Sequence, residues 1–375
     1  MKRMKKIKHL YYKDLAGFRL IGMLLIFSYI IMYLLATNDR SDFSIHALAY
    51  TSEFADVGLS LFVLLSSFLI TVQGLREYKY TKSFSLRKFY IRRLLKVAPI
   101  LIIGLLFYFF IHPLLINFLK LTSLEGSNSI KNLLFFPTYH GLLRAEVFIY
   151  AYILYNVLLI SFFYLVWGFV LKYLQSILPL ISILLIVGGV FLKFLYINES
   201  NSFEHYILYY IFEVGIGAAL AVIFRKQKNL VDWIKKLSHA QIVTFYITVI
   251  SIILLWFFVL QIEILSALIK MVFTLLIACM IMEQTFAKHS ILKLRDIKVI
   301  MRLGKLSYNM IVLSPIIAVI ILIAIESLDR SITAPIIKVV YPIITLLITW
   351  LLADIFYKYI SKFFIRMQSD FKPLK

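Results

Sequence analysis

Long apolar segments recur from one end of this chain to the other, and they constrain its fold more than any other feature. A helix that crosses the bilayer core needs about 20 consecutive apolar residues, and no polar block long enough to fold alone interrupts the series. With 62% hydrophobic and only 16% charged residues, the chain has too little polar surface to cover a water-soluble core. The sequence predicts an all-α integral membrane protein that forms a single membrane domain over 1–375.

Ten segments have the length and composition of transmembrane helices. The first is too long for the apolar part of a signal peptide, so we expect it to remain as a membrane span. The predicted spans are 15–36, 54–74, 94–118, 146–170, 175–196, 206–224, 240–259, 262–284, 306–326 and 335–357.

The formal net charge of +21 is explained by where the cations lie. Thirty lysines and arginines fall in the leader, the tail and the alternate connections that share their side, against five in the other connections. Because cationic loops stay in the cytoplasm, this asymmetry predicts an even number of spans and cytoplasmic N- and C-termini, with a basic cytoplasmic tail at 358–375. We expect a multi-pass protein of the bacterial inner membrane, whose cations face anionic lipid and not nucleic acid.

Ionisable side chains inside membrane spans are costly and therefore mark candidate functional or packing sites. Glu213 and Lys270 could pair with each other between helices, or could form the ion pathway of a transporter. Lys96 and Lys193 lie near predicted span ends, where a lysine can extend to the interface. The single cysteine, Cys279, excludes a disulfide framework and a cysteine-based metal site, and we expect no metal.

Several strings in the sequence match a known pattern. Residues 60–71, SLFVLLSSFLIT, resemble DLFFVLSGFLIT, and residues 84–99, FSLRKFYIRRLLKVAP, resemble FSLRRFYxRRxxRxxP. These strings are similar to those of the acyltransferase-3 family, bacterial integral membrane enzymes that move acyl groups from cytoplasmic acyl-CoA onto envelope or exported sugars. Over residues 14–320 the family order is kept, with shorter matches at 146–150, 212–219 and 303–308.

The resemblance implies a histidine general base that takes the proton from a sugar hydroxyl as it attacks a thioester carbonyl. In the family this histidine follows an arginine by eleven positions, and with Arg19 as the arginine it would stand at position 30. Here that position is Ile30, beside Tyr29. The second family histidine would fall on Ser314, and the aspartate of the second span is Ser60. These three polar positions of the family are therefore changed, whereas the surrounding strings of the family pattern are retained.

Four residues are the candidates for altered catalytic chemistry: Tyr29, Arg19, Glu146 and His140. A tyrosine with an unperturbed pKa of about 10 is a poor base at neutral pH. Arg19 could also be an interfacial anchor, and Glu146 could cap the helix that it begins. His140 lies six residues before Glu146 and is the best substitute base by location.

A dense group of cations, Arg87, Lys88, Arg92 and Arg93, opens the segment after the second span. Charge-assisted hydrogen bonds from these residues would suit the pyrophosphate of CoA, so they are the predicted donor-binding residues. The same cations could instead anchor the helix on anionic lipid.

Three functions follow from these observations. The first is an acyl-CoA-dependent transferase acting on an envelope glycan or lipid-linked sugar, either with an altered base or as a catalytically degenerate member of the family. The second is a non-catalytic scaffold or partner subunit in an envelope membrane-protein complex. The third is a transporter or flippase, which the absence of paired Gly/Pro-interrupted spans disfavours.

Overall fold

The computed structural model describes residues 2–38, 42–111, 114, 145–195, 208–259, 263–290, 293–327 and 335–371. Over these ranges every regular element is helical and none is a strand, which confirms the all-α prediction. The long helices are α1 (Lys2–Asn38), α2 (Asp42–Thr81), α3 (Leu86–Leu106), α7 (Ala145–Tyr173), α8 (Leu178–Leu195), α10 (Ile211–Lys226), α12 (His239–Val259), α13 (Glu263–Phe286), α14 (Lys298–Ser327) and α15 (Pro335–Phe356).

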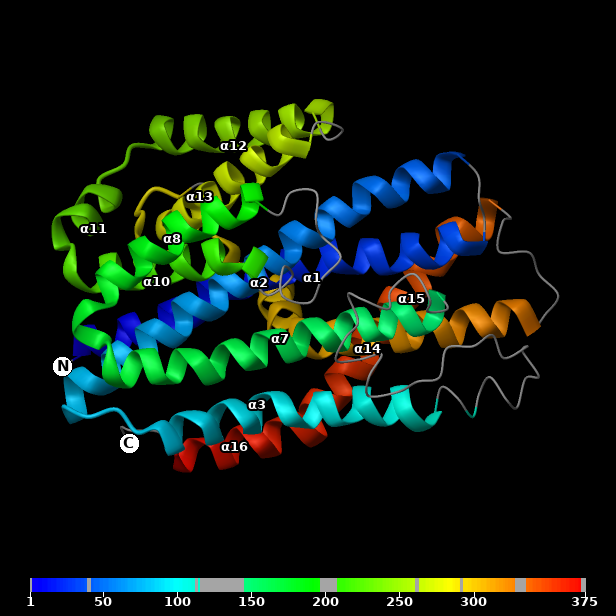
Figure 1. The fold of residues 1–375 in the computed structure, drawn as a ribbon, viewed down its shortest axis with the longest axis horizontal. Coiled ribbons are helices and arrows are strands. Elements are labelled where there is room, and N and C mark those ends of the chain that lie inside the picture. Colours follow the sequence, from blue (N-terminus) through cyan, green and yellow to red (C-terminus); the bar gives the residue numbers. More distant parts are fainter. Residues whose placement is uncertain are drawn as a thin grey trace.

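Short helical pieces extend or join these helices. They are η1 (Phe107–Ile111), η3 (Gln175–Ile177), α11 (Lys228–Lys235), η4 (Leu294–Asp296), η5 (Tyr357–Ser361) and α16 (Lys362–Asp370). The last two show that the predicted basic tail continues as helix, and α16 packs along α3 (Figure 1).

In the part of the chain that the structure describes, nine helices are long and apolar enough to cross a membrane. They match nine of the ten predicted spans. The tenth, predicted at 206–224, is α10, which is described over 16 residues and packs between α2 and α8. The prediction of about ten transmembrane helices is therefore confirmed.

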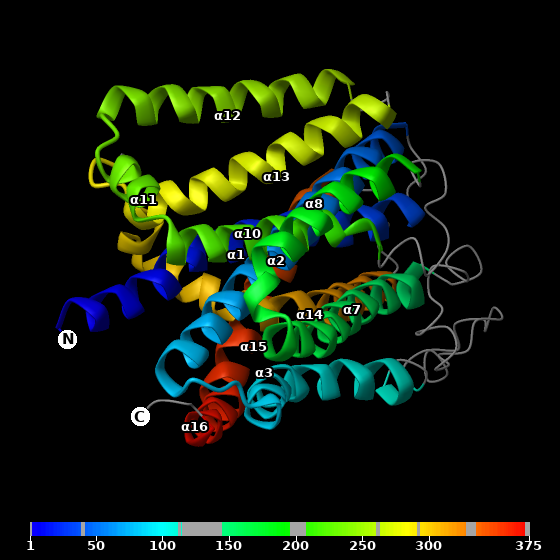
Figure 2. The ribbon, with the colours of Figure 1, turned by 60° about the vertical axis from the view of Figure 1, so that its left-hand side comes forward.

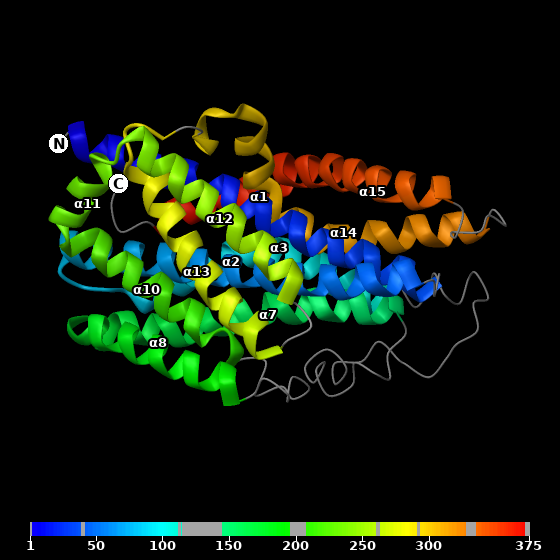
Figure 3. The ribbon, with the colours of Figure 1, turned by 90° about the horizontal axis from the view of Figure 1, so that it is seen from above.

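The helices run up and down, so that the basic connections gather at one end of the bundle. The α2–α3, α7–α8 and α13–α14 connections lie at the same end as the start of α1 and the end of α16 (Figures 1 and 3). We call this the cationic end, because it carries the connections counted as basic above. The start of α1 and the end of α16 thus lie at the same end of the bundle (Figure 1), while the even number of spans and the cytoplasmic location of this end stay predictions.

The α1–α2 pair is the centre of the bundle. One core cluster joins it to α3, α7, α14 and α15, and a second joins it to α10, α12 and α13. In Figure 2, α12 and α13 accordingly lie on one side of the pair and α3 and α16 on the other. The two helices approach closely at Gly22 and Gly58, where a Cβ on Gly58 would lie 2.7 Å from the Gly22 carbonyl oxygen. Small residues permit such contacts between membrane helices.

A second close approach fixes α14 against α1. A Cβ on Gly304 would overlap the carbonyl oxygen of Ala16, so only glycine fits at this crossing. Gly304 belongs to the Leu-Gly-Lys-Leu-Ser-Tyr string at 303–308. That string therefore has a packing role that does not depend on chemistry.

Candidate functional site

The basic segment predicted to bind the acyl donor forms the first two turns of α3. Ser85 caps this helix, because its Oγ accepts a hydrogen bond from the Lys88 backbone N–H at 3.4 Å. The side chains of Arg87 and Lys88 are exposed. The four predicted cations are therefore divided, with this pair facing outward and the next pair facing into the bundle.

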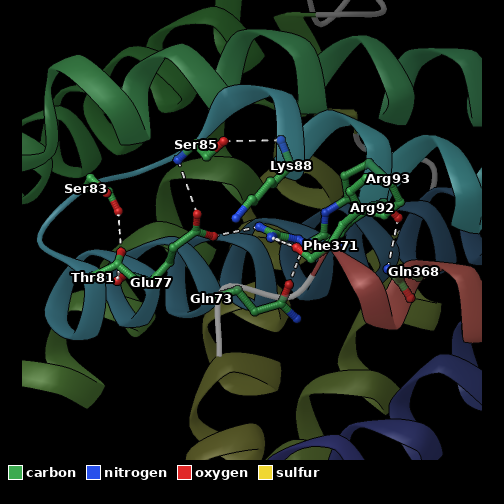
Figure 4. Close-up of polar contacts among 10 residues, drawn as sticks. All are labelled: Gln73, Glu77, Thr81, Ser83, Ser85, Lys88, Arg92, Arg93, Gln368 and Phe371. Carbon is green, nitrogen blue, oxygen red and sulfur yellow. Dashed lines mark hydrogen bonds and ion pairs between the residues drawn. The ribbon is translucent and has the colours of Figure 1, made fainter. Parts of the chain in front are cut away.

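Arg92 is buried and fully engaged by the protein (Figure 4). Its Nη2 lies 2.7 Å from Oε2 of Glu77 on α2, and its Nη1 donates to the Phe371 carbonyl oxygen at 2.8 Å. The Gln368 side chain donates in turn to the Arg92 carbonyl at 2.9 Å. Arg92 thus ties α3 to α2 and to the C-terminal segment.

Arg93 faces the interior beside a polar and aromatic wall. Its Nη2 donates to Gln73 Oε1 at 2.6 Å, and its guanidinium carbon lies 5.5 Å from the ring centroids of both Phe89 and Tyr164. A guanidinium over an aromatic face gains cation–π stabilisation. Arg93 is therefore held in place from α2, α3 and α7.

Lys96, one turn beyond Arg92 on α3, has an exposed side chain. It lies within electrostatic reach of Arg19 on α1 and of Arg93. The structure thus brings together Arg19 and Arg93, two of the residues singled out from the sequence, and adds a third cation. Three positive groups from two helices form a site that attracts an anion.

Sequence reasoning missed one member of this region. Lys96, interpreted as a lysine that extends to the interface, is exposed and occupies the third basic position of the RRxxR string. Glu77 was not considered, although it is the one acidic residue between Arg76 and Arg93. A lone carboxylate among seven cations is a signal for an internal ion pair.

The position at which the resemblance predicts the general base is closed by apolar packing. Ile30 has no exposed surface, and Tyr29 is 9% exposed. The Tyr29 ring packs at 5.3 Å, edge-on, against Tyr152 and at 5.8 Å against Tyr33. An aromatic cluster therefore lies beside the predicted position of the base.

Ser314, at the position where the resemblance predicts the second histidine, has a structural role. Pro315 has no backbone N–H, so the carbonyl of Ile311, four residues earlier, loses its helical donor. The Ser314 hydroxyl donates to that carbonyl at 3.1 Å and is fully buried. The Ser314 hydroxyl therefore satisfies the carbonyl that Pro315 leaves without a helical donor.

The third altered position, Ser60, lies next to a carboxylate from another helix. Its hydroxyl is 3.3 Å from Oε1 of Glu213 on α10, and that oxygen also contacts Lys193 Nζ at 2.6 Å. Glu213 and Lys193 are buried, with side-chain exposures of 0% and 3%. The carboxylate missing from position 60 is thus replaced by one from across the interface, neutralised by an ammonium group.

The predicted ion pair between Glu213 and Lys270 is wrong, because each residue pairs with a different partner. Lys270 instead contacts Glu53 at 2.5 Å and Asp56 at 3.2 Å. Lys193, which was expected to extend to the interface, is the partner of Glu213. Hydropathy shows which charges lie in spans but does not show which helices face one another.

Two of the catalytic candidates cannot be placed. His140 lies outside the described residues, and the side chain of Glu146, near the start of α7, is likewise outside them. Among the residues whose side chains are described, no group of three or more His, Cys, Asp or Glu could hold a metal ion.

The long apolar helices and the cations gathered at one end of the bundle (Figure 1) are those of a polytopic membrane protein. A sequence model of the acyltransferase-3 family, described as an acyltransferase domain, matches residues 12–354, nearly the whole chain. The chain belongs to this family. No curated protein and no solved structure matched it.

Proposed function

We propose that this protein is a catalytically degenerate acyltransferase-3 member, which keeps the cytoplasmic face for an acyl-CoA but lacks the family's base. The single observation that carries the proposal is Ile30, fully buried at the expected position of the base and flanked by the Tyr29 ring. A general base must reach the proton that it removes. An isoleucine has no group that could accept that proton.

The state of Ser314 and Ser60 supports the same proposal. Ser314 is committed to the backbone of α14, and Ser60 to a neutralised carboxylate. Each altered position is integrated into packing or hydrogen bonding, as expected where selection for chemistry has been replaced by selection for the fold. A degenerate member would then serve as a scaffold or partner subunit in an envelope complex.

The direct test is turnover by the purified protein in lipid nanodiscs. With acetyl-CoA as the probe, we expect CoA release no faster than in empty nanodiscs, with or without an envelope glycan acceptor. Turnover that is lost in His140→Ala or in Glu146→Gln would contradict the proposal and identify a substitute base.

One observation favours a second function, an active transferase with an altered base. The cations Arg19 and Arg93 both lie within electrostatic reach of Lys96, an arrangement suited to a thioester's anionic carrier. This alternative predicts transfer that depends on Tyr29, Glu146 or His140, so the variants Tyr29→Phe, Glu146→Gln and His140→Ala separate it from the first.

The proposal places the protein in the bacterial inner membrane with its cationic end in the cytoplasm. In a Cys279→Ser background, we expect Thr81→Cys, at the exposed end of α2, to react with an impermeant maleimide only after the membrane is opened. Reaction from outside intact cells would reverse the orientation and remove access to cytoplasmic acyl-CoA.

A further inference from the structure

A pocket of about 490 Å³ opens at the cationic end between the start of α14 and the end of α15. Pockets that bind small molecules typically enclose about 300–1,000 Å³, so this one has a suitable size. None of the α3 cations contributes to it. Its charged lining consists of Arg295, Lys298, Arg302, Lys305, Lys358 and Asp354.

Three cations of this pocket share one face by helical spacing. Lys298, Arg302 and Lys305 follow one another at intervals of four and three residues in α14, and such residues are neighbours on a helix surface. Helical spacing thus points three cations toward the pocket. Arg295 is added from η4, which the extended Ile297 separates from α14, and Lys358 is added from η5.

The charge in this pocket is only partly balanced. Its lining holds five cations and one carboxylate, and Arg295 also contacts the neighbouring Asp296 at 3.6 Å. Asp354 contacts Arg302 Nη2 and Lys358 Nζ, each at 2.8 Å. Over the described part of the chain, no ion pair involves Lys298 or Lys305, and both are exposed.

Asp354 orients the cations more than it neutralises them. Its side chain is 14% exposed, whereas those of Arg302 and Lys358 are 56% and 59% exposed. The carboxylate thus lies beneath the two cationic groups and holds them at the mouth of the pocket. Fixing long side chains in advance lowers the entropic cost of binding.

We propose that this α14 pocket binds an anion that carries two or more phosphate groups. A ligand with a single carboxylate would balance only a small part of the pocket's positive charge. A ligand with two or more clustered phosphates would balance most of it. Arginine donates to phosphate in pairs and lysine supplies a point charge, and the pocket presents both kinds of residue.

Two cellular molecules carry this chemistry: a soluble phosphorylated carrier such as acyl-CoA, and a phospholipid with two phosphates such as cardiolipin. If the carrier binds here, the inference rests on the proposed function and identifies the residues that hold its phosphates. Binding to the pocket and acyl transfer are measured in separate experiments. A protein without transferase activity could still bind the anion, and failure to bind at this pocket would not show whether the protein transfers acyl groups.

The first arm of the test uses a soluble probe. The full chain in phosphatidylcholine nanodiscs is titrated by calorimetry with adenosine 3′,5′-bisphosphate. We expect the Lys298→Ala/Lys305→Ala variant to bind about tenfold more weakly, because two charge-assisted hydrogen bonds are lost. Lys79→Ala/Lys362→Ala removes the same charge from exposed positions outside the pocket and should bind as the wild type does.

The second arm uses nanodiscs that contain cardiolipin. If the ligand is a lipid, cardiolipin will raise the unfolding temperature of the wild type and of the control variant but not of Lys298→Ala/Lys305→Ala. Comparable unfolding temperatures of the variants in phosphatidylcholine alone establish that both are folded. Failure of both probes to bind, or equal binding by wild type and Lys298→Ala/Lys305→Ala, would overturn the inference.

Discussion

Two groups of cations lie at the same end of this molecule, and the protein uses them differently. On α3, Arg92 and Arg93 are directed inward and held by Glu77, by Gln73 and by the Phe371 carbonyl. Around the start of α14, five cations line an open pocket, and the Asp354 carboxylate contacts only two of them, Arg302 and Lys358. The comparison teaches that the number of cations in a segment does not indicate how much charge is available to a ligand.

The largest effect expected from this contrast is at Glu77. Glu77→Gln leaves Arg92 buried without its carboxylate, and removing one partner of a buried ion pair typically costs about 3–5 kcal/mol. We expect a loss of that size in the free energy of unfolding, measured by SDS titration in mixed micelles. The double variant Glu77→Gln/Arg92→Gln should recover part of it, and a wild-type midpoint for the single variant would show that α3 does not depend on this pair.

A smaller effect is expected at the C-terminal segment. Deleting residues 368–375 removes the hydrogen bond from the Arg92 guanidinium to the Phe371 carbonyl and the one from Gln368 to the Arg92 backbone carbonyl. A hydrogen bond to a charged group is worth about 1.5–3 kcal/mol, and one between neutral groups about 0.5–1.5 kcal/mol. We expect the unfolding midpoint to fall, but less than in Glu77→Gln. Deleting only residues 372–375 keeps both contacts and should leave the midpoint unchanged; equal loss in the two deletions would mean that the contacts with Arg92 are unimportant.

The smallest effect on stability is expected at Asp354, the matched carboxylate of the α14 pocket. Its two cationic partners are more than half exposed, and ion pairs of that kind contribute little. Asp354→Asn should therefore leave the unfolding midpoint unchanged. Binding of adenosine 3′,5′-bisphosphate should weaken, because Arg302 and Lys358 lose the carboxylate that holds them in place. Destabilisation comparable to that of Glu77→Gln would remove the distinction between the two regions.

Much of the fold could be predicted from the sequence, because apolar length and charge alternation are local properties. The span predicted at 335–357 is α15 almost to the residue. The span predicted at 54–74 is shorter than α2, which runs over Asp42–Thr81. Its outer turns carry Glu53 and Asp56, which Lys270 neutralises from α13, and hydropathy contains no information on that pairing.

Residues of the candidate site could be predicted from the sequence only where they belong to a recognisable motif. The RRxxR string identified Arg92 and Arg93. It did not indicate that Arg92 would form an ion pair with Glu77 and a hydrogen bond with the C-terminal segment. The α14 pocket depends on α15 returning beside α14, which brings Asp354 to Arg302 across 52 residues of sequence. Contacts of this kind follow from the packing of distant helices and leave no local pattern.

The measurement that tests the account most directly is the accessibility of position 30. In a Cys279→Ser background, Ile30→Cys is treated with a small water-soluble maleimide in nanodiscs, beside Thr81→Cys as the exposed control. Because Ile30 has no exposed surface, we expect Thr81→Cys to be modified and Ile30→Cys to remain unmodified until the protein is unfolded. Modification of Ile30→Cys in the folded protein, slowed by added acetyl-CoA, would contradict the account, since it would show an open, donor-facing site where the family has its base.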